Sequence, residues 1–185
     1  MSKLFYIIGA SGAGKDTLIN HARTQIKGTE SVIFAHRYIT RPPFAGNENY
    51  ISLSKEEFQQ RVNADLFTLH WESHGNFYGI GQEINHWINN GFNVVVNGSR
   101  EYLPIAREKY PDMEVILIIA NEDIIIERLL SRGREDAGEI KKRIARTSSL
   151  TAPLENCIII ENNSTIEDAG HKLINIITLT QKHYI

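Results

Sequence analysis

The run Gly9-Ala10-Ser11-Gly12-Ala13-Gly14-Lys15-Asp16 decides how this chain of 185 residues is expected to fold. It matches the phosphate-binding loop pattern G-x-x-x-x-G-K, except that Asp16 stands where Ser or Thr is usual. Before it, residues 4–8 form a short apolar run typical of a buried parallel strand. After it, residues 17–26 carry apolar side chains at helical spacing. Strand, loop and helix together predict a P-loop that binds a nucleoside triphosphate.

The loop is suited to phosphate because of its backbone and its one lysine. Glycines let the chain turn with N–H groups pointing inward, and the N-terminus of the following helix adds partial positive charge. Lys15 would reach the β- and γ-phosphates of the nucleotide. The residues expected to contact the nucleotide are Gly9, Ala10, Ser11, Gly12, Ala13, Gly14, Lys15, Asp16 and Thr17.

Asp16 has two interpretations, which do not exclude each other. A carboxylate is a hard oxygen ligand that Mg²⁺ accepts in place of the usual hydroxyl. An aspartate at the start of a helix is also a favourable cap, because the helix dipole attracts negative charge there. We favour a metal role for Asp16, either direct or through a water molecule.

Composition restricts the class of protein. The net charge is −2, so no broad basic surface indicates a nucleic-acid or membrane partner. Cys157 is the only cysteine, so an internal disulfide is excluded, as is typical of a reducing cytoplasm. No signal peptide and no run of about 20 apolar residues is found. We expect a cytoplasmic enzyme with a small-molecule substrate, and a homodimer is left open.

Further apolar runs alternate with helical segments, which predicts an α/β fold with a parallel sheet flanked by helices. The expected strands lie at residues 92–96, 113–119 and 157–160, and Ser164 to Glu167 forms a capping box before the last helix. Two segments interrupt this pattern. We therefore predict one kinase domain over 1–185, with a core of about 1–36, 92–131 and 151–185, an acceptor-binding insert of about 37–91 and a lid of about 132–150.

Arginines gather in and beside the predicted lid. Guanidinium groups can stabilise the negative charge that spreads over the oxygens during phosphoryl transfer. The acidic residues between them allow another interpretation, an exposed helix with surface ion pairs. For Arg128 and Arg146 the two interpretations are evenly balanced, and Arg128 is kept as a candidate nucleotide contact.

These motifs resemble the guanylate kinase-like kinases along almost the whole chain. Thr40-Arg41-Pro42 is similar to the T-R-x-P acceptor motif of that family, and residues 75–79 are similar to its G-N-Y-Y-G turn. Arg132 and Arg143 have the spacing of its arginine lid. The resemblance implies a P-loop NTPase fold with an acceptor-binding insert and an arginine lid, with ATP as donor and Mg²⁺ as metal.

The same resemblance assigns roles to single residues. Lys15, Arg132 and Arg143 would be catalytic, acting on the transferring phosphoryl group. Arg41, Tyr50 and Tyr78 would bind the phosphate of the acceptor, and Asn162 would lie near the adenine.

The chain departs from guanylate kinases where those enzymes bind guanine. Leu69 aligns with their base-binding glutamate, and Arg37 aligns with a base-binding serine. Polar base edges left unpaired in a buried site cost about 1–3 kcal/mol each. We therefore expect an acceptor without guanine, and Arg37 indicates an additional anionic or hydroxyl-rich group.

Residues 36–41, Glu48-Asn49 and residues 96–100 resemble the ribose 1,5-bisphosphate phosphokinases, a bacterial branch of this fold that belongs to phosphonate breakdown. The resemblance implies transfer of the γ-phosphoryl group of ATP to the 1-phosphate of ribose 1,5-bisphosphate. Arg37, Arg41 and Arg100 would then bind a substrate with two phosphates.

Two alternatives and one hypothesis remain. A guanylate kinase is the nearest alternative enzyme, and Leu69 disfavours it. A non-catalytic guanylate kinase-like module that binds peptides is disfavoured because Lys15, Arg132 and Arg143 are all present. Asn97 stands where guanylate kinases carry an acidic residue, so we hypothesise that the metal-facing carboxylate has moved to Asp16.

Overall fold

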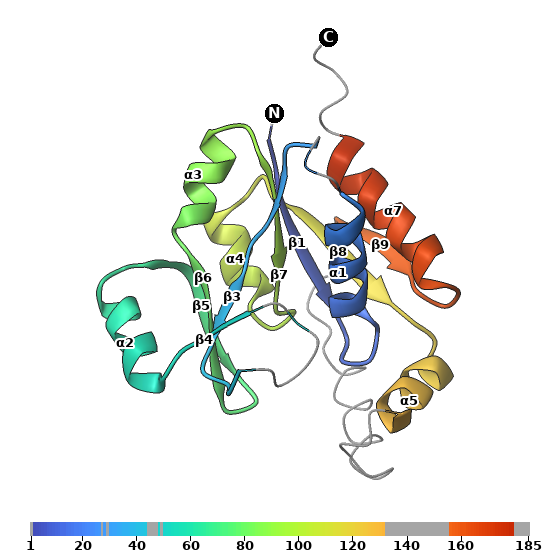
Figure 1. The fold of residues 1–185 in the computed structure, drawn as a ribbon, viewed down its shortest axis with the longest axis horizontal. Helices are drawn as coiled ribbons and strands as arrows, with labels where there is room; N and C mark the ends of the chain where they lie inside the picture. The colour runs from blue at the N-terminus through green and yellow to red at the C-terminus, as the bar shows by residue number, and fades with distance from the viewer. Residues whose placement is uncertain are drawn as a thin grey trace.

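Five parallel strands form the centre of the molecule, in the order β2-β7-β1-β8-β9 (Figure 1). The computed structural model describes residues 2–26, 28, 30–43, 48, 50–131 and 156–179. The strands are β1 (Leu4–Gly9), β2 (Val32–Phe34), β7 (Asn93–Asn97), β8 (Glu114–Ile119) and β9 (Cys157–Glu161). The predicted parallel α/β sheet is confirmed, and only the short β2 had not been predicted as one of its strands.

Helices cover both faces of this sheet (Figure 1). On one face lie α1 (Lys15–Gln25) and α7 (Ile166–Leu179), and on the other lie α3 (Glu83–Asn89) and α4 (Leu103–Lys109). β1 alternates between the two cores, with Phe5 and Ile7 on the α1 and α7 side and Tyr6 and Ile8 on the other. Because both faces are covered, the interior positions of the strands are apolar, which made them recognisable in the sequence.

The segment between β2 and β7 forms a second sheet, in the order β4-β3-β6-β5. Its strands are β3 (Arg37–Ile39), β4 (Tyr50–Ser52), β5 (Phe67–Ser73) and β6 (Asn76–Gly81). Helix α2 (Lys55–Asn63) packs on this sheet through Phe58, whose ring lies 4.7 Å from that of Phe67. Ser54 caps α2 by accepting a hydrogen bond of 3.0 Å from the Glu57 N–H. Side chains of this sheet lie opposite the P-loop, across a cavity that both line.

The last helix is capped one residue later than predicted. Helix α7 starts at Ile166, and Thr165 Oγ1 accepts a hydrogen bond of 3.2 Å from the Asp168 N–H. Thr165 therefore caps this helix where Ser164 was expected. The apolar face predicted for the helix is present at Leu173 and Ile177, which are fully buried, but Ile166 is 42% exposed.

Some predictions fall outside the described residues. Helix α5 (Glu122–Ser131) is the last described element before a gap in the description that runs to residue 155. The predicted lid of about 132–150 lies in that gap, together with Arg132, Arg143 and Arg146. Among the described residues, no helix is both long and apolar enough to cross a membrane.

Candidate active site

A cavity of about 260 Å³ lies at the carboxyl end of β1, between the P-loop and the second sheet. One wall is the P-loop itself, from Gly9 to Asp16 apart from Ala13. The opposite wall combines side chains of the second sheet with those that follow β7: Arg37, Trp71, Ser73, His74, Tyr78, Ser99, Arg100 and Glu101. Ligands of open α/β sheets bind at this edge, where strands end in loops.

The P-loop needs glycine at two of its positions. Gly12 and Gly14 have φ angles of +88° and +90°, a left-handed conformation that other residues rarely adopt. Gly14 is also the N-cap of α1. Asp16 is therefore not the cap of this helix, and that interpretation is wrong, although its place in the first turn still suits a negative charge.

Two predicted nucleotide contacts lie behind the P-loop. Asn162 is 2% exposed and donates a hydrogen bond of 2.7 Å to the Ala13 carbonyl oxygen. Arg128 donates to the same oxygen at 3.4 Å and to the Asn162 carbonyl oxygen at 3.1 Å. Neither residue lines the cavity, and neither does Thr17, which is exposed on α1. The arrangement braces the loop, and direct contact of these residues with the nucleotide remains a prediction.

Lys15 is held in place by a small polar network. Its ammonium group donates to Asn97 Oδ1 and, at 3.1 Å, to Asp16 Oδ1. Asn97 completes the network by donating a hydrogen bond of 2.8 Å from Nδ2 to Asp16 Oδ1. Burial lowers the pKa of Lys15, and the negative charge of Asp16 opposes that effect. Asp16 and Asn97 are thus in direct contact beside Lys15, as the hypothesis of a moved carboxylate requires.

Asp16 is ionised under physiological conditions. Burial acts to raise its pKa, but the charges of Lys15 and Arg37 and the hydrogen bond from Asn97 outweigh burial and hold the pKa well below its usual range. The Asp16 side chain is 42% exposed and lines the cavity.

This carboxylate fits the requirements of Mg²⁺. That ion keeps several waters and is usually bound by one or two carboxylates together with substrate phosphates. Across the described ranges, no three His, Cys, Asp or Glu side chains form a ready-made metal cluster. With a triphosphate in the P-loop, the Asp16 carboxylate and the phosphates would together supply the oxygen ligands that suit Mg²⁺.

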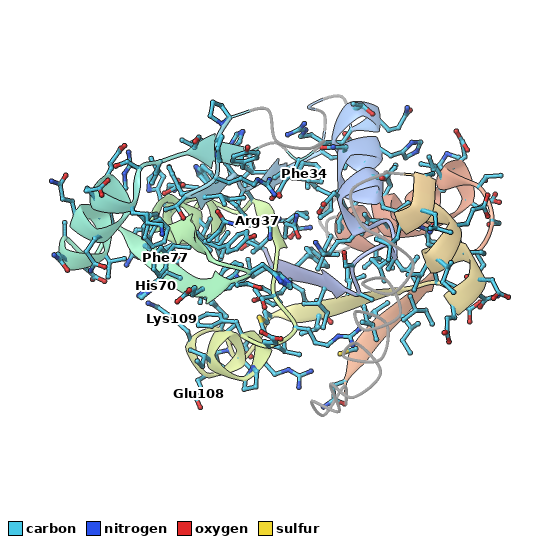
Figure 2. All side chains as sticks on the ribbon, turned by 90° about the horizontal axis from the view of Figure 1, so that it is seen from below. Phe34, Arg37, His70, Phe77, Glu108 and Lys109 are labelled. Atoms are coloured by element: carbon cyan, nitrogen blue, oxygen red, sulfur yellow. The ribbon has the colours of Figure 1, made fainter. Side chains whose placement is uncertain are left out.

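Arg37 is the innermost cation of the second sheet. Arg37 is 9% exposed. It lies near the middle of the molecule, whereas His70 lies toward the outside (Figure 2). Its Nε donates to Glu48 Oε1, and its guanidinium group lies 5.1 Å from the centre of the Tyr78 ring. These contacts leave the guanidinium on the cavity wall opposite the P-loop.

Arg41 and Tyr50 do not line the cavity themselves. Arg41 Nη2 lies 3.6 Å from Glu48 Oε2, and its guanidinium group lies 4.4 Å from the centre of the Tyr50 ring. The Tyr50 hydroxyl donates to the Pro42 carbonyl oxygen. Arg100, in contrast, lines the cavity directly, and burial lowers its pKa. The structure thus brings Arg37, Tyr78 and Arg100 to the cavity, and Glu48 joins Arg41 to Arg37.

Comparison with known proteins identifies the family. The sequence model described as guanylate kinase matches residues 1–180. The chain belongs to the guanylate kinase family. It is accordingly a kinase, and the resemblance drawn from its motifs is confirmed.

Curated relatives of this guanylate kinase family member cover nearly its whole length. One from Thiobacillus denitrificans is 46% identical over 176 residues, which are 95% of this chain and 93% of the relative. One from Desulfomicrobium baculatum is 47% identical over 180 residues, 97% of this chain and 96% of the relative. Both relatives are named ribose 1,5-bisphosphate phosphokinase PhnN.

A solved guanylate kinase shares the fold. The crystal structure of guanylate kinase from Anaplasma phagocytophilum matches with a TM-score of 0.68, covering 97% of this chain and 86% of that chain. The sequences are 16% identical, so this likeness concerns the fold alone. The predicted guanylate kinase-like α/β fold is confirmed.

Several cavity residues of this kinase had no predicted role: Trp71, Ser73, His74, Ser99 and Glu101. The strand alternation of β5 was the available signal, because residues 69, 71 and 73 share one face of a regular strand. Leu69 is 1% exposed within the core and is not part of the cavity wall. Trp71, two residues further along the same face of β5, lines the cavity instead.

Proposed function

We propose that this kinase transfers the γ-phosphoryl group of ATP to the 1-phosphate of ribose 1,5-bisphosphate. The products would be 5-phosphoribosyl 1-diphosphate (PRPP) and ADP, and the reaction would serve phosphonate breakdown. The observation that carries the proposal is the nearly buried Arg37 guanidinium on the wall opposite Lys15. The names of the curated relatives support the same substrate.

The chemistry needs no general base. A phosphate oxygen at C1 of the sugar, already ionised at neutral pH, attacks the γ-phosphorus, and a new P–O bond forms. The bond between the γ-phosphorus and the β–γ bridging oxygen breaks, and ADP leaves with that electron pair. Protein catalysis of such a transfer consists mainly of positioning and of charge stabilisation.

Each wall of the cavity has its own part in this reaction. The P-loop backbone and Lys15 would bind the triphosphate, with Lys15 held in position by Asn97 and Asp16. Asp16 would hold Mg²⁺, which would supply positive charge to offset the negative charge of the phosphates. Arg132 and Arg143 would act on the transferring group from the lid.

The opposite wall would bind the acceptor. Arg37 and Arg100 lie where they could contact a phosphate, and guanidinium groups bind phosphate in a bidentate manner. Arg41 would contribute through its contact with Glu48, because a bound phosphate could take the place of that carboxylate between the two arginines. Leu69 offers no hydrogen bond to a base and lies in the core.

The test compares acceptors in one assay. ADP formation is measured with Mg-ATP and either ribose 1,5-bisphosphate or GMP. We expect kcat/KM to favour ribose 1,5-bisphosphate by at least about 100-fold, because the buried, apolar Leu69 stands where guanylate kinases carry their base-binding glutamate. Comparable or better turnover of GMP would contradict the proposal. Binding of ATP without transfer to either acceptor would indicate a non-catalytic module instead.

A further inference from the structure

Trp71 lies in the middle of an aromatic stack at the cavity wall. Its ring lies 5.6 Å from that of Tyr78 with an interplanar angle of 6°, and 5.4 Å from that of Tyr102 with an angle of 27°. The Arg37 guanidinium lies 5.1 Å from the centre of the Tyr78 ring. Arg37, Tyr78, Trp71 and Tyr102 therefore form one continuous stack, which we call the cavity stack.

The three rings of the cavity stack come from three parts of the chain. Strand pairing of β5 with β6 sets Trp71 opposite Tyr78, and Tyr102 follows β7. Trp71 is 8% exposed and packs in the same core cluster as Leu69 and Ile80. Stacked rings held in this way have little freedom to move aside, because protein cores are close-packed. The indole is thus a rigid part of the wall.

The groups that line the cavity indicate which acceptor it can bind. The P-loop forms one side of the cavity, and the second sheet and the segment after β7 form the other. The groups facing the cavity from the second sheet and after β7 include two guanidinium groups, which suit phosphate. The Trp71 indole is the largest apolar group on that wall.

We propose that Trp71 is a specificity-determining residue that closes the acceptor cavity to phosphorylated sugars carrying a base. The inference rests on the proposed function, since it concerns which acceptors reach the same site. Removal of the indole would leave a slot lined by Tyr78 and Tyr102, into which a base could stack.

The test measures binding, so it does not depend on turnover. A non-hydrolysable ATP analogue with Mg²⁺ fills the nucleotide site, and calorimetry then gives the Kd of ribose 5-phosphate and of GMP, which carries a base. Both ligands are measured with the unaltered chain and with Trp71→Ala. The control is Trp87→Ala, because Trp87 packs against the same core cluster from α3 but does not line the cavity.

We expect Trp71→Ala to improve the affinity for GMP relative to ribose 5-phosphate by at least about tenfold. Trp87→Ala should leave that ratio unchanged. An unchanged ratio in folded Trp71→Ala, or an equal change in Trp87→Ala, would overturn the inference. If Trp71→Ala fails to fold, Trp71→Leu removes the ring while keeping an apolar side chain, and the same outcomes apply to it.

The inference and the proposed function fail in different ways. If the unaltered chain does not phosphorylate ribose 1,5-bisphosphate, the proposed function is wrong, whatever the binding ratio. If it does so and the ratio of Kd values does not respond to Trp71, only the role of Trp71 is wrong.

Discussion

Replacing Tyr6 by Phe removes a single oxygen atom from beneath the active site. Tyr6 is fully buried on β1, and its hydroxyl donates to the Ser99 carbonyl oxygen at 3.2 Å and accepts from the Ser99 N–H at 3.0 Å. Burial raises the pKa of Tyr6, so the hydroxyl stays protonated and can donate at physiological pH. Gly98 lies so close to the Tyr6 ring that a Cβ there would overlap it. These contacts fix the segment that presents Ser99 and Arg100 to the cavity.

The size of the effect follows from the two hydrogen bonds. Each neutral hydrogen bond contributes about 0.5–1.5 kcal/mol, so Tyr6→Phe should lower the free energy of unfolding by about 1–3 kcal/mol. For a domain of this size that corresponds to a fall in Tm of roughly 2–12 °C. Looser placement of Arg100 should also raise the KM for the acceptor up to about tenfold, with little change in kcat, as expected for a loss of uniform binding.

Tyr110→Phe is the matched control. The Tyr110 hydroxyl also makes two hydrogen bonds, each of 2.6 Å, with Thr68 and Asn85, but Tyr110 does not line the cavity. Thermal unfolding and steady-state kinetics are measured for both variants. Both should lose stability, and only Tyr6→Phe should raise the acceptor KM. If the two variants give the same KM, or if Tyr6→Phe changes neither quantity, the positioning role of Tyr6 is refuted.

Three further predictions concern charged groups of the cavity. Asp16→Asn should raise the Mg²⁺ concentration for half-maximal activity at least about tenfold, and an unchanged Mg²⁺ titration would rule out a metal role for Asp16. Arg37→Met should raise the acceptor KM about 10- to 100-fold, because hydrogen bonds to charged groups contribute about 1.5–3 kcal/mol. Its control is Arg61→Met, since Arg61 also lies over a tyrosine ring, at 5.0 Å, but away from the cavity, and it should leave KM unchanged. The pKa of Asp16 is lowered from 3.8, so the stability it contributes is complete above pH 3.8 and is lost as the pH falls through the lowered value. Urea unfolding of the unaltered chain and of Asp16→Asn should therefore differ by a constant amount from about pH 5 to 8 and by less in stronger acid, and a difference that varies across the neutral range would contradict the ionised state of Asp16.

The P-loop and the central sheet could be predicted because local sequence determines them. Gly12 and Gly14 occupy backbone conformations that glycine adopts readily, so the motif and the geometry coincide. The interior positions of the buried strands are apolar because helices cover both faces of the sheet. Both signals lie within a few consecutive residues and need no knowledge of the tertiary fold.

The acceptor wall could not be predicted in the same way, because distant segments build it. The stack of Trp71 with Tyr102 joins residues that come together only through the pairing and order of the strands. Asn162 likewise follows β9, and only the fold shows that its amide braces Ala13 behind the P-loop. Motif resemblance pointed to a nucleotide contact for Asn162, whereas the contact present in the structure is with the loop.

The identity of the acceptor can be tested most directly by product analysis. The protein is mixed with Mg-ATP and ribose 1,5-bisphosphate, and the phosphorus NMR spectrum of the products is recorded. We predict a new diphosphate at C1 of the sugar, formed in the same amount as ADP. Release of orthophosphate without a sugar diphosphate, or efficient phosphorylation of GMP in a parallel reaction, would contradict the assignment.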